Sequence, residues 1–185
     1  DDELRDAVQY LEYLFGIGTD AVIVQGLGLA VLAKSYFPGM QVHASTQMTI
    51  YSPEGALPLK DAGIDRVVVA RELRLKEVLS IKRLSGLPAE VFVQGVLCMS
   101  YSGQCLMSSL IGGRSGNRGR YAQPCRKWYR VVDQDRGGRV IKEGYLLSPR
   151  DLFTLDQMDK LLRAGIDSFK IEGRMKRPEY VAAAT

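Results

Sequence analysis

Short apolar runs alternate with amphipathic segments along most of the chain. Residues 3–15 place apolar side chains at the i, i+3, i+4 and i+7 positions of a helix, which Gly16 and Gly18 end. Five runs are apolar without polar alternation, as strands of a buried parallel sheet are. These predicted strands cover 21–24, 41–44, 66–70, 91–93 and 169–171. Further helices are predicted at about 28–37, from 53, at about 73–84, from 148 to 165, and from 178.

A Gly-x-Asp sequence recurs where a predicted helix leads into a predicted strand. It lies at 18–20, 63–65 and 165–167. Glycine adopts the left-handed conformation that ends a helix, and aspartate hydrogen-bonds within a tight connection. The repeat predicts βα units in one α/β domain over residues 1–185, with five parallel strands and an irregular insertion at about 96–147 that is rich in Gly and Arg.

Polar residues follow each predicted strand, where α/β sheets and βα barrels both carry their active face. Turn chemistry alone could place polar residues there, but their recurrence after five strands favours a functional face. From this set we expect an acid/base and anion-holding group formed by Arg71, Glu72, Glu172 and Arg174. A structural ion pair between Glu172 and Arg174 is the alternative.

All three cysteines of the chain, Cys98, Cys105 and Cys125, lie in the insertion. Their spacing is not that of the CxxC pairs of a zinc ribbon. Gathered thiols suit a soft metal or an iron–sulfur cluster, although clusters normally take four cysteines. A metal or cluster, a reactive thiol and inert packing all remain open.

His43 is the single histidine and lies near the end of a predicted strand. A general base, a metal ligand and a hydrogen-bonded core residue are all open for it. A Cys98–His43 dyad is conceivable, because strand ends meet in space.

The charge of the chain is uneven. The net charge is +4, yet residues 111–130 contain no Asp or Glu. Their basic residues, interleaved with aromatic ones, predict contact with the phosphates and bases of a nucleic acid, against the alternative of a solvated loop. The expected contacts are Arg114, Arg118, Arg120 and Arg126. Without an 18-residue apolar stretch, a signal peptide or an even set of cysteines, the sequence predicts a cytoplasmic location and no membrane span.

Several motifs resemble those of peptidase family U32, the collagenase-like peptidases, over nearly the whole chain. They are Glu90-x-Phe92-x-x-Gly95-x-x-Cys98-x4-Gly103-x-Cys105-x-x-Ser108, His43-x-Ser45-Thr46-Gln47, Ala70-Arg71-Glu72, Asn117-Arg118-Gly119, Gln123-Pro124-Cys125-Arg126 and Lys170-Ile171-Glu172-Gly173-Arg174-Met175-Lys176. The resemblance implies the second half of a TIM-type (β/α)8 barrel, with three βα units preceding residue 1. Such a half barrel has two open edges, so we expect pairing with another copy, as in a homodimer.

The resemblance also implies candidate functions. Some members of the family are called collagenases or peptidases, and others take part in hydroxylating RNA or a quinone precursor. In the latter group four cysteines hold an iron–sulfur cluster. Cys98, Cys105 and Cys125 match three of these, whereas Phe153 stands where many members have the fourth and Gln94 stands where relatives often have His.

Three functions follow as expectations. The first is a cysteine-ligated modifying activity of the hydroxylation type on RNA or another large substrate, with an iron–sulfur cluster, zinc or no metal. The second is a peptidase that uses His43, Glu172 and a metal or Cys98. The third is a binding fragment without catalysis.

Overall fold

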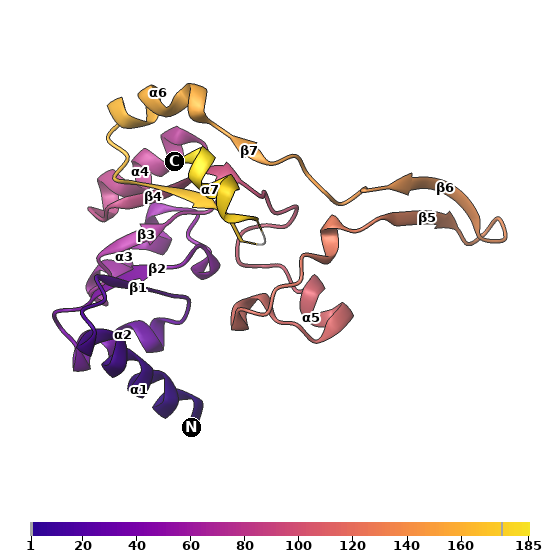
Figure 1. Ribbon diagram of the computed structural model, residues 1–185. Helices are drawn as coiled ribbons and strands as arrows, with labels where there is room; N and C mark the ends of the chain where they lie inside the picture. Colours follow the sequence, from indigo (N-terminus) through magenta and orange to yellow (C-terminus); the bar gives the residue numbers. More distant parts are fainter. Residues whose placement is uncertain (1, 175) are drawn as a thin grey trace.

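Five parallel strands form one curved sheet in the computed structural model, which describes residues 2–174 and 176–185. The sheet order is β1, β2, β3, β4 and β8, and each neighbouring pair is parallel. The strands are β1 (Ala21–Val24), β2 (Gln41–Ala44), β3 (Arg66–Val68), β4 (Ala89–Gly95) and β8 (Ser168–Glu172). The prediction of five parallel strands in a half barrel is confirmed (Figure 1).

Four helices cover one face of this sheet and form the core with it. They are α1 (Asp2–Gly16), α2 (Leu27–Tyr36), α3 (Pro53–Asp61) and α4 (Leu75–Ser85). Val42, Val67 and Ala89 point toward the helices and have no exposed surface. On β1, by contrast, the side chain of Ile23 points to the concave face and is half exposed. The alternation of strand side chains therefore separates a helix-covered core from an open concave face.

The repeated Gly-x-Asp sequences connect neighbouring βα units. All three glycines have positive φ, between 76° and 80°. Asp65 accepts hydrogen bonds from the Val42 amide at 2.7 Å and from the Lys34 Nζ at 2.9 Å. Asp167 accepts in the same way from the first amide of β4 at 2.8 Å and from the Lys82 Nζ at 2.7 Å. Each of these two aspartates thus ties the strand that follows it to the neighbouring strand and helix.

The segment predicted as one helix from 148 to 165 is different. Leu152–Phe153 forms a short strand, β7, which pairs antiparallel with the end of β4. Only a 3-10 turn at Leu155–Gln157 and the helix α6 (Met158–Arg163) follow. The reason lies in β3, whose pairing with β4 ends at Glu90 and leaves the last residues of β4 free on that side. Tertiary pairing therefore outweighs the local helical pattern. The last helix, α7 (Pro178–Ala184), begins at the predicted proline.

The insertion is not irregular throughout. It contains a helix, α5 (Met107–Gly112), 3-10 turns at Gly116–Arg118 and Pro124–Arg126, and a two-stranded antiparallel hairpin. The hairpin strands β5 (Tyr129–Asp133) and β6 (Arg139–Gly144) extend away from the sheet as an arm (Figure 1). No helix in the described part of the chain is long and apolar enough to cross a membrane.

Candidate functional site

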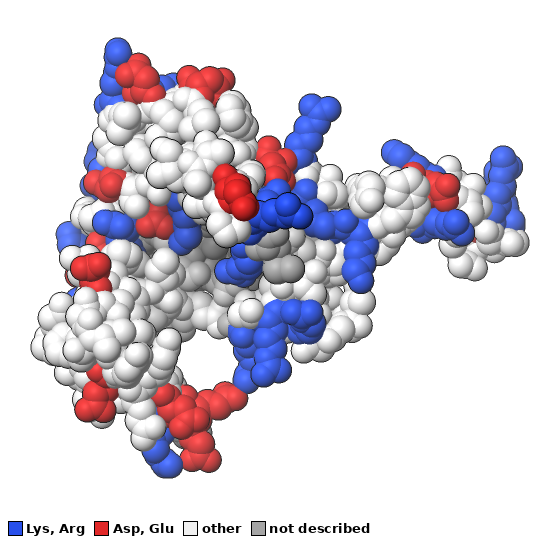
Figure 2. Space-filling view, in the orientation of Figure 1, with Lys and Arg blue, Asp and Glu red and all other residues white. Residues whose placement is uncertain are grey.

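A cavity of about 420 Å³ lies where the carboxyl ends of the strands meet the insertion. One wall comes from strand ends, including Arg71, Phe92 and Lys170, and the other from residues 96–126. Figure 2 shows Lys and Arg side chains gathered around the hollow between the sheet and the hairpin. The volume falls within the range of small-molecule sites.

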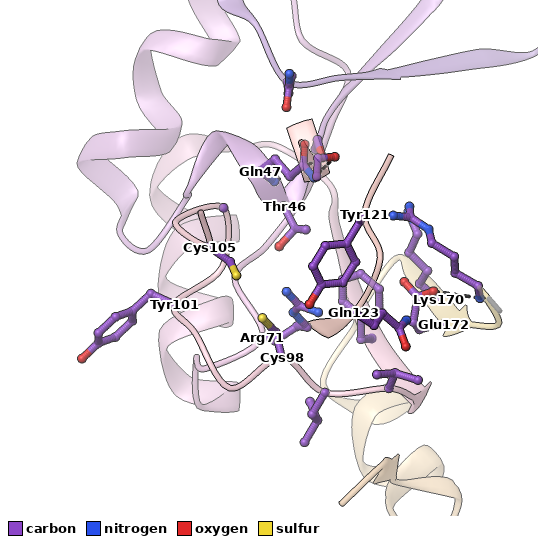
Figure 3. A pocket seen from close by; sticks show the side chains of 18 of the residues that line it. Thr46, Gln47, Arg71, Cys98, Tyr101, Cys105, Tyr121, Gln123, Lys170 and Glu172 are labelled. Carbon is purple, nitrogen blue, oxygen red and sulfur yellow. Dashed lines mark hydrogen bonds between the residues drawn. The ribbon is translucent and has the colours of Figure 1, made fainter. Parts of the chain in front are cut away.

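All three cysteines line this cavity. Cys125 is 4% exposed, Cys98 and Cys105 are half-buried, and none forms a disulfide. Figure 3 shows the Cys98 and Cys105 sulfurs and the Tyr121 hydroxyl turned toward one space. The Tyr121 Oη lies 3.6 Å from the Cys125 Sγ. Burial, the hydrogen bond to Cys125 and the nearby thiols together raise the pKa of Tyr121.

These thiols do not yet form a closed metal site. Among the residues that the structure describes, no three or more His, Cys, Asp or Glu side chains are grouped so that they could hold an ion. Phe153, at the position implied for a fourth cysteine, is 62% exposed and is not a cavity residue. As arranged in the described chain, the three thiols do not fit a four-cysteine cluster.

Ser102 fixes the loop that contains Cys98 and Cys105. Its side chain is fully buried, and its Oγ donates to Glu72 at 2.7 Å and accepts from the Arg71 amide at 3.1 Å. The Ser102 amide also donates to Glu72 at 2.6 Å. Burial raises the pKa of Glu72, but the two hydrogen bonds from Ser102, together with the Glu72 backbone and the charge of Arg71, outweigh it, so the pKa of Glu72 lies below its usual value. Glu72 therefore positions the loop and does not line the cavity.

Gly103 lets the same loop pack closely on the turn after β2. Its φ is +80°, and a Cβ here would lie 2.8 Å from the Gln47 carbonyl oxygen and closer still to Thr49. Only glycine combines this conformation with such a close backbone approach. The cysteine loop is thus fixed from two sides, by Ser102 and by Gly103.

Two cations flank the Phe92 ring at the strand side of the cavity. The Arg71 Cζ lies 5.4 Å and the Lys170 Nζ 5.6 Å from the ring centroid, within cation–π range. Lys170 also pairs with the buried Glu90 at 3.1 Å, and Arg66 pairs with the same carboxylate at 3.6 Å. The cavity therefore contains an aromatic ring with two positive charges close to it.

Glu172 and Arg174 also line the cavity, as predicted for the strand-end group. The contact between them is a hydrogen bond of 2.9 Å from the Arg174 amide to the Glu172 Oε1. Their side chains form no ion pair in the described part of the chain, so the structure does not display the predicted structural alternative.

His43 and Gln94 lie away from the cavity wall. His43 is 6% exposed, and its Nε2 lies 3.4 Å from the Gln41 Oε1. Burial, followed by the charge of Arg66, lowers the pKa of His43, so the ring is neutral at pH 7. The Gln94 amide group donates to the Tyr180 hydroxyl at 3.0 Å. His43 is thus not brought beside Cys98 on the cavity wall.

Of the four predicted anion-contacting arginines, only Arg126 lines the cavity. It donates to the Leu97 carbonyl at 2.9 Å and to the Ser148 hydroxyl at 2.8 Å, and it pairs with Asp151. Arg126 therefore joins the two ends of the insertion. The other three lie on the outer surface, where Arg118 pairs with Glu3 at 2.7 Å and the Arg114 Nε donates to the Arg120 carbonyl at 3.0 Å.

Sequence reasoning did not single out Ser102 or the place of Tyr121 at the thiols, and it named Lys170 only as part of a family motif, without a role in the site. Lys170 could have been found, because it is a charged residue inside a short apolar strand. Tyr121 was recognised only as one of several aromatic residues in a basic stretch, and no spacing rule connects it to the cysteines.

Comparison with known proteins gives a consistent set of relatives. A family model described as "Peptidase family U32" matches residues 1–185. The chain is 42% identical over 185 residues to a 23S rRNA 5-hydroxycytidine C2501 synthase of Escherichia coli K12, covering all of this chain and 28% of that protein. It is 34% identical to a tRNA hydroxylation protein P1 of Bacillus subtilis 168, covering 98% of this chain and 43% of the relative. It is 41% identical to a collagenase of Porphyromonas gingivalis, covering 77% of this chain and 37% of that protein. The chain thus spans less than half the length of each of these relatives.

Proposed function

The chain belongs to peptidase family U32, and we propose that it forms the substrate-binding and thiol-bearing part of a protein that hydroxylates a nucleoside in RNA. The observation that carries this proposal is the 42% identity to an rRNA 5-hydroxycytidine synthase over every residue of the chain. An RNA substrate also implies a cytoplasmic location.

The cavity supplies the contacts that a flipped nucleotide needs. A base extruded from RNA is held by stacking on aromatic rings and by polar contacts at its edge. Phe92 and Tyr121 offer rings, and Arg71 and Arg174 offer positive charge for a phosphate. We assign the substrate nucleoside to this cavity.

The hairpin arm supplies a second contact with RNA. The arm, residues 129–144, contains four Lys and Arg against three Asp and Glu, and six further basic residues lie in the rest of residues 96–150. Two of the basic residues of the arm are neutralised, Arg130 by Glu143 at 3.0 Å and Arg136 by Asp133 at 3.5 Å. Arg139 and Lys142 are exposed and form no ion pair within the described residues. We assign these two to phosphates of the strand that leads into the cavity.

We propose that the three cysteines contribute thiolates to a metal centre of the iron–sulfur type in the full-length protein, where further residues would have to complete the site, because the described side chains alone are not grouped to hold an ion. Thiolates are the usual ligands of such clusters, and a cluster held here would supply electron transfer beside the substrate. The chain's own contribution is to hold the thiols on a loop fixed by Ser102 and Gly103, next to the two cations at Phe92.

The test uses the full-length protein in an Escherichia coli strain that lacks its 23S rRNA 5-hydroxycytidine synthase. Nucleosides from 23S rRNA are analysed by mass spectrometry. We expect 5-hydroxycytidine to return with the wild type and to be lost with Cys105→Ser. If the wild type restores no hydroxylated nucleoside in rRNA or tRNA although it is expressed and soluble, the proposed reaction is wrong.

RNA contact by the arm is tested by binding to an rRNA fragment at several salt concentrations. Arg139→Ala with Lys142→Ala is expected to weaken binding and to lower the slope of log affinity against log salt by about 2. The matched control is Arg83→Ala with Lys160→Ala, two exposed basic residues on the helices α4 and α6. Equal slopes for the two double variants would show that the arm does not contact the RNA.

A peptidase is the second candidate, since one relative is a collagenase at 41% identity. The geometry favours it less, because His43 does not line the cavity with Cys98 and the described residues form no nucleophile–base pair there. Protein cleavage by the full-length protein that is abolished by His43→Ala would support it. RNA affinity unaffected by replacing the cysteines, with no reaction, would instead identify a binding fragment.

The open edges of the sheet lead to the proposed pairing. β1 pairs only with β2, and β8 only with β4, within the described chain. An edge strand presents unpaired backbone N–H and C=O groups that can pair with another strand. We therefore propose that a further copy, or further strands of a longer protein, cover these two edges. Sedimentation of the full-length protein distinguishes the two, because a monomer would exclude pairing between copies.

A further inference from the structure

Two large aromatic side chains lie exposed at the base of the hairpin arm. Trp128 and Tyr145 have 56% and 62% of their surface exposed, and their ring centroids lie 5.3 Å apart in an edge-to-face arrangement. They stand opposite one another just outside the first pair of β5 and β6, Tyr129 with Gly144. In an edge-to-face pair, the ring that presents its edge keeps both of its own faces free of its partner. The pair therefore offers an aromatic face to solvent.

Arg126 connects this aromatic pair to the cavity. It lines the cavity and donates to the Leu97 carbonyl at 2.9 Å and to the Ser148 hydroxyl at 2.8 Å. Trp128 follows Arg126 by two residues, which span at most about 7 Å of chain. The Ser148 amide donates to the Tyr145 carbonyl at 3.1 Å. Both members of the pair are thus held beside the cavity wall.

The neighbouring Tyr129 shows what a structural aromatic residue looks like at this place. It is half-buried, and its hydroxyl donates to the Pro124 carbonyl at 2.9 Å. Neither the Trp128 Nε1 nor the Tyr145 hydroxyl has a hydrogen-bond partner among the described residues. Tyr129 therefore packs the base of the arm, whereas the exposed pair keeps its polar groups available for a ligand.

The charge around the exposed pair suits a polyanion. Residues 111–130 contain no Asp or Glu, and Lys127, next to Trp128, is exposed and forms no ion pair within the described chain. A second exposed pair, Tyr10 with Tyr13 on α1, has the opposite surroundings. Residues 1–20 contain six Asp and Glu against one Arg. Exposed rings beside basic residues are how proteins bind single-stranded nucleic acids.

From these observations we infer that Trp128 and Tyr145 form a stacking platform for an unpaired base of the RNA strand that leads into the cavity. The inference rests on the proposed function, in which the cavity takes a nucleoside of RNA. Within a duplex both faces of a base are covered by its neighbours, so the platform selects single-stranded or looped RNA. Stacking tolerates any base, because every base has a π-face. The platform therefore requires an unpaired substrate and leaves the choice of base to the cavity.

The experiment measures how variants of the full-length protein bind a short single-stranded RNA oligonucleotide and the same oligonucleotide annealed to its complement. The variants are Trp128→Ala and Trp128→Phe, and binding is measured at several salt concentrations. Tyr10→Ala is the matched control, because it removes an exposed ring from an aromatic pair in an acidic stretch. Trp128 is the single tryptophan of the sequence, and the difference in fluorescence between the wild type and Trp128→Phe isolates its emission.

We expect Trp128→Ala to weaken binding of the single strand on the order of tenfold or more. The slope of log affinity against log salt should stay unchanged, because removing a neutral ring changes no contact with a phosphate. Trp128→Phe keeps a ring and should lose less affinity, which shows that the arm itself is intact. Tyr10→Ala should bind both RNAs as the wild type does, and the duplex should not distinguish Trp128→Ala from it. The single strand should quench the emission of Trp128.

Three results would overturn the inference. The first is equal affinity of Trp128→Ala and Tyr10→Ala for the single strand, or no binding of that strand by the wild type. The second is an equal loss of affinity for the single strand and the duplex, which would indicate a distorted arm instead of a lost stacking contact. The third is Trp128 emission that RNA does not change, or that acrylamide cannot quench in the free protein because another part of the full-length protein covers the pair.

Nucleoside analysis of rRNA and tRNA separates this inference from the proposed reaction. Hydroxylation by the wild type, together with RNA binding that does not depend on Trp128, removes the stacking platform and keeps the proposed function. Quenching of Trp128 by single-stranded RNA without any hydroxylated nucleoside keeps the platform and removes the proposed reaction.

Discussion

Replacing Ser102 with alanine should open the loop that holds Cys98 and Cys105 without unfolding the sheet. The change removes the hydrogen bond from the Ser102 Oγ to Glu72 and the acceptor of the Arg71 amide. A hydrogen bond to a charged group contributes about 1.5–3 kcal/mol, and a lost neutral one about 1 kcal/mol. Glu72 is partly exposed and can turn to water, so we discount the sum to about 2 kcal/mol.

At about 1.4 kcal/mol for each tenfold change, this loss corresponds to a roughly 30-fold increase in opening of the loop. Amide hydrogen exchange at residues 98–105 and the labelling rate of Cys105 by a thiol reagent measure it. Ser100→Ala is the matched control, because Ser100 lies in the same loop and makes no side-chain hydrogen bond among the described residues. Equal exchange in the two variants would refute the assignment of Ser102 as the anchor of the loop.

Three further predictions concern stability and loop packing. The fold lowers the pKa of His43, so its contribution to stability is present above pH 6.5 and is lost as the pH falls below that value. We therefore expect His43→Gln to lose less stability than the wild type between pH 7 and pH 5. Urea unfolding at the two pH values measures this difference. Asp167→Ala leaves the buried amide at the start of β4 without its acceptor and should lower the free energy of unfolding by about 1–3 kcal/mol. The control Asp159→Ala breaks an exposed ion pair and should lower it by less than about 1 kcal/mol. Chemical denaturation compares the two variants. Gly103→Ala would place a Cβ against the Gln47 carbonyl and should raise the labelling rate of the cysteines by displacing their loop, while unchanged labelling would contradict that contact.

The sequence alone determined the βα architecture. Continuous apolar runs mark the strands, and each Gly-x-Asp sequence encodes its own turn, so strands and most helices follow from local patterns. The capping of α3 is equally local. The side chain of Ser52 accepts a hydrogen bond from the Gly55 amide, and Pro53 follows Ser52 at the first helical position. The clustering of three cysteines in one stretch likewise indicated the region of the site.

The hairpin arm could have been found from the sequence. Two runs rich in β-branched residues flank Gly137-Gly138, which is a turn signal. The high content of Gly and Arg in the insertion masked this pattern. The strand at Leu152–Phe153 could not have been found in this way, because it exists only where β3 leaves the edge of β4 unpaired.

Only the tertiary structure decided which polar residues share the cavity. Glu72 and His43 stand at strand ends as predicted, yet Glu72 turns to Ser102 and His43 is buried beside Gln41. Tyr121 is the opposite case. It lies in a loop, and it contacts Cys125 only because the left-handed turn at Gln123 brings the two residues together. The physical reason is that strands and helices depend mainly on interactions between residues close in sequence. A site of this kind depends instead on how loops that are distant in sequence pack against one another.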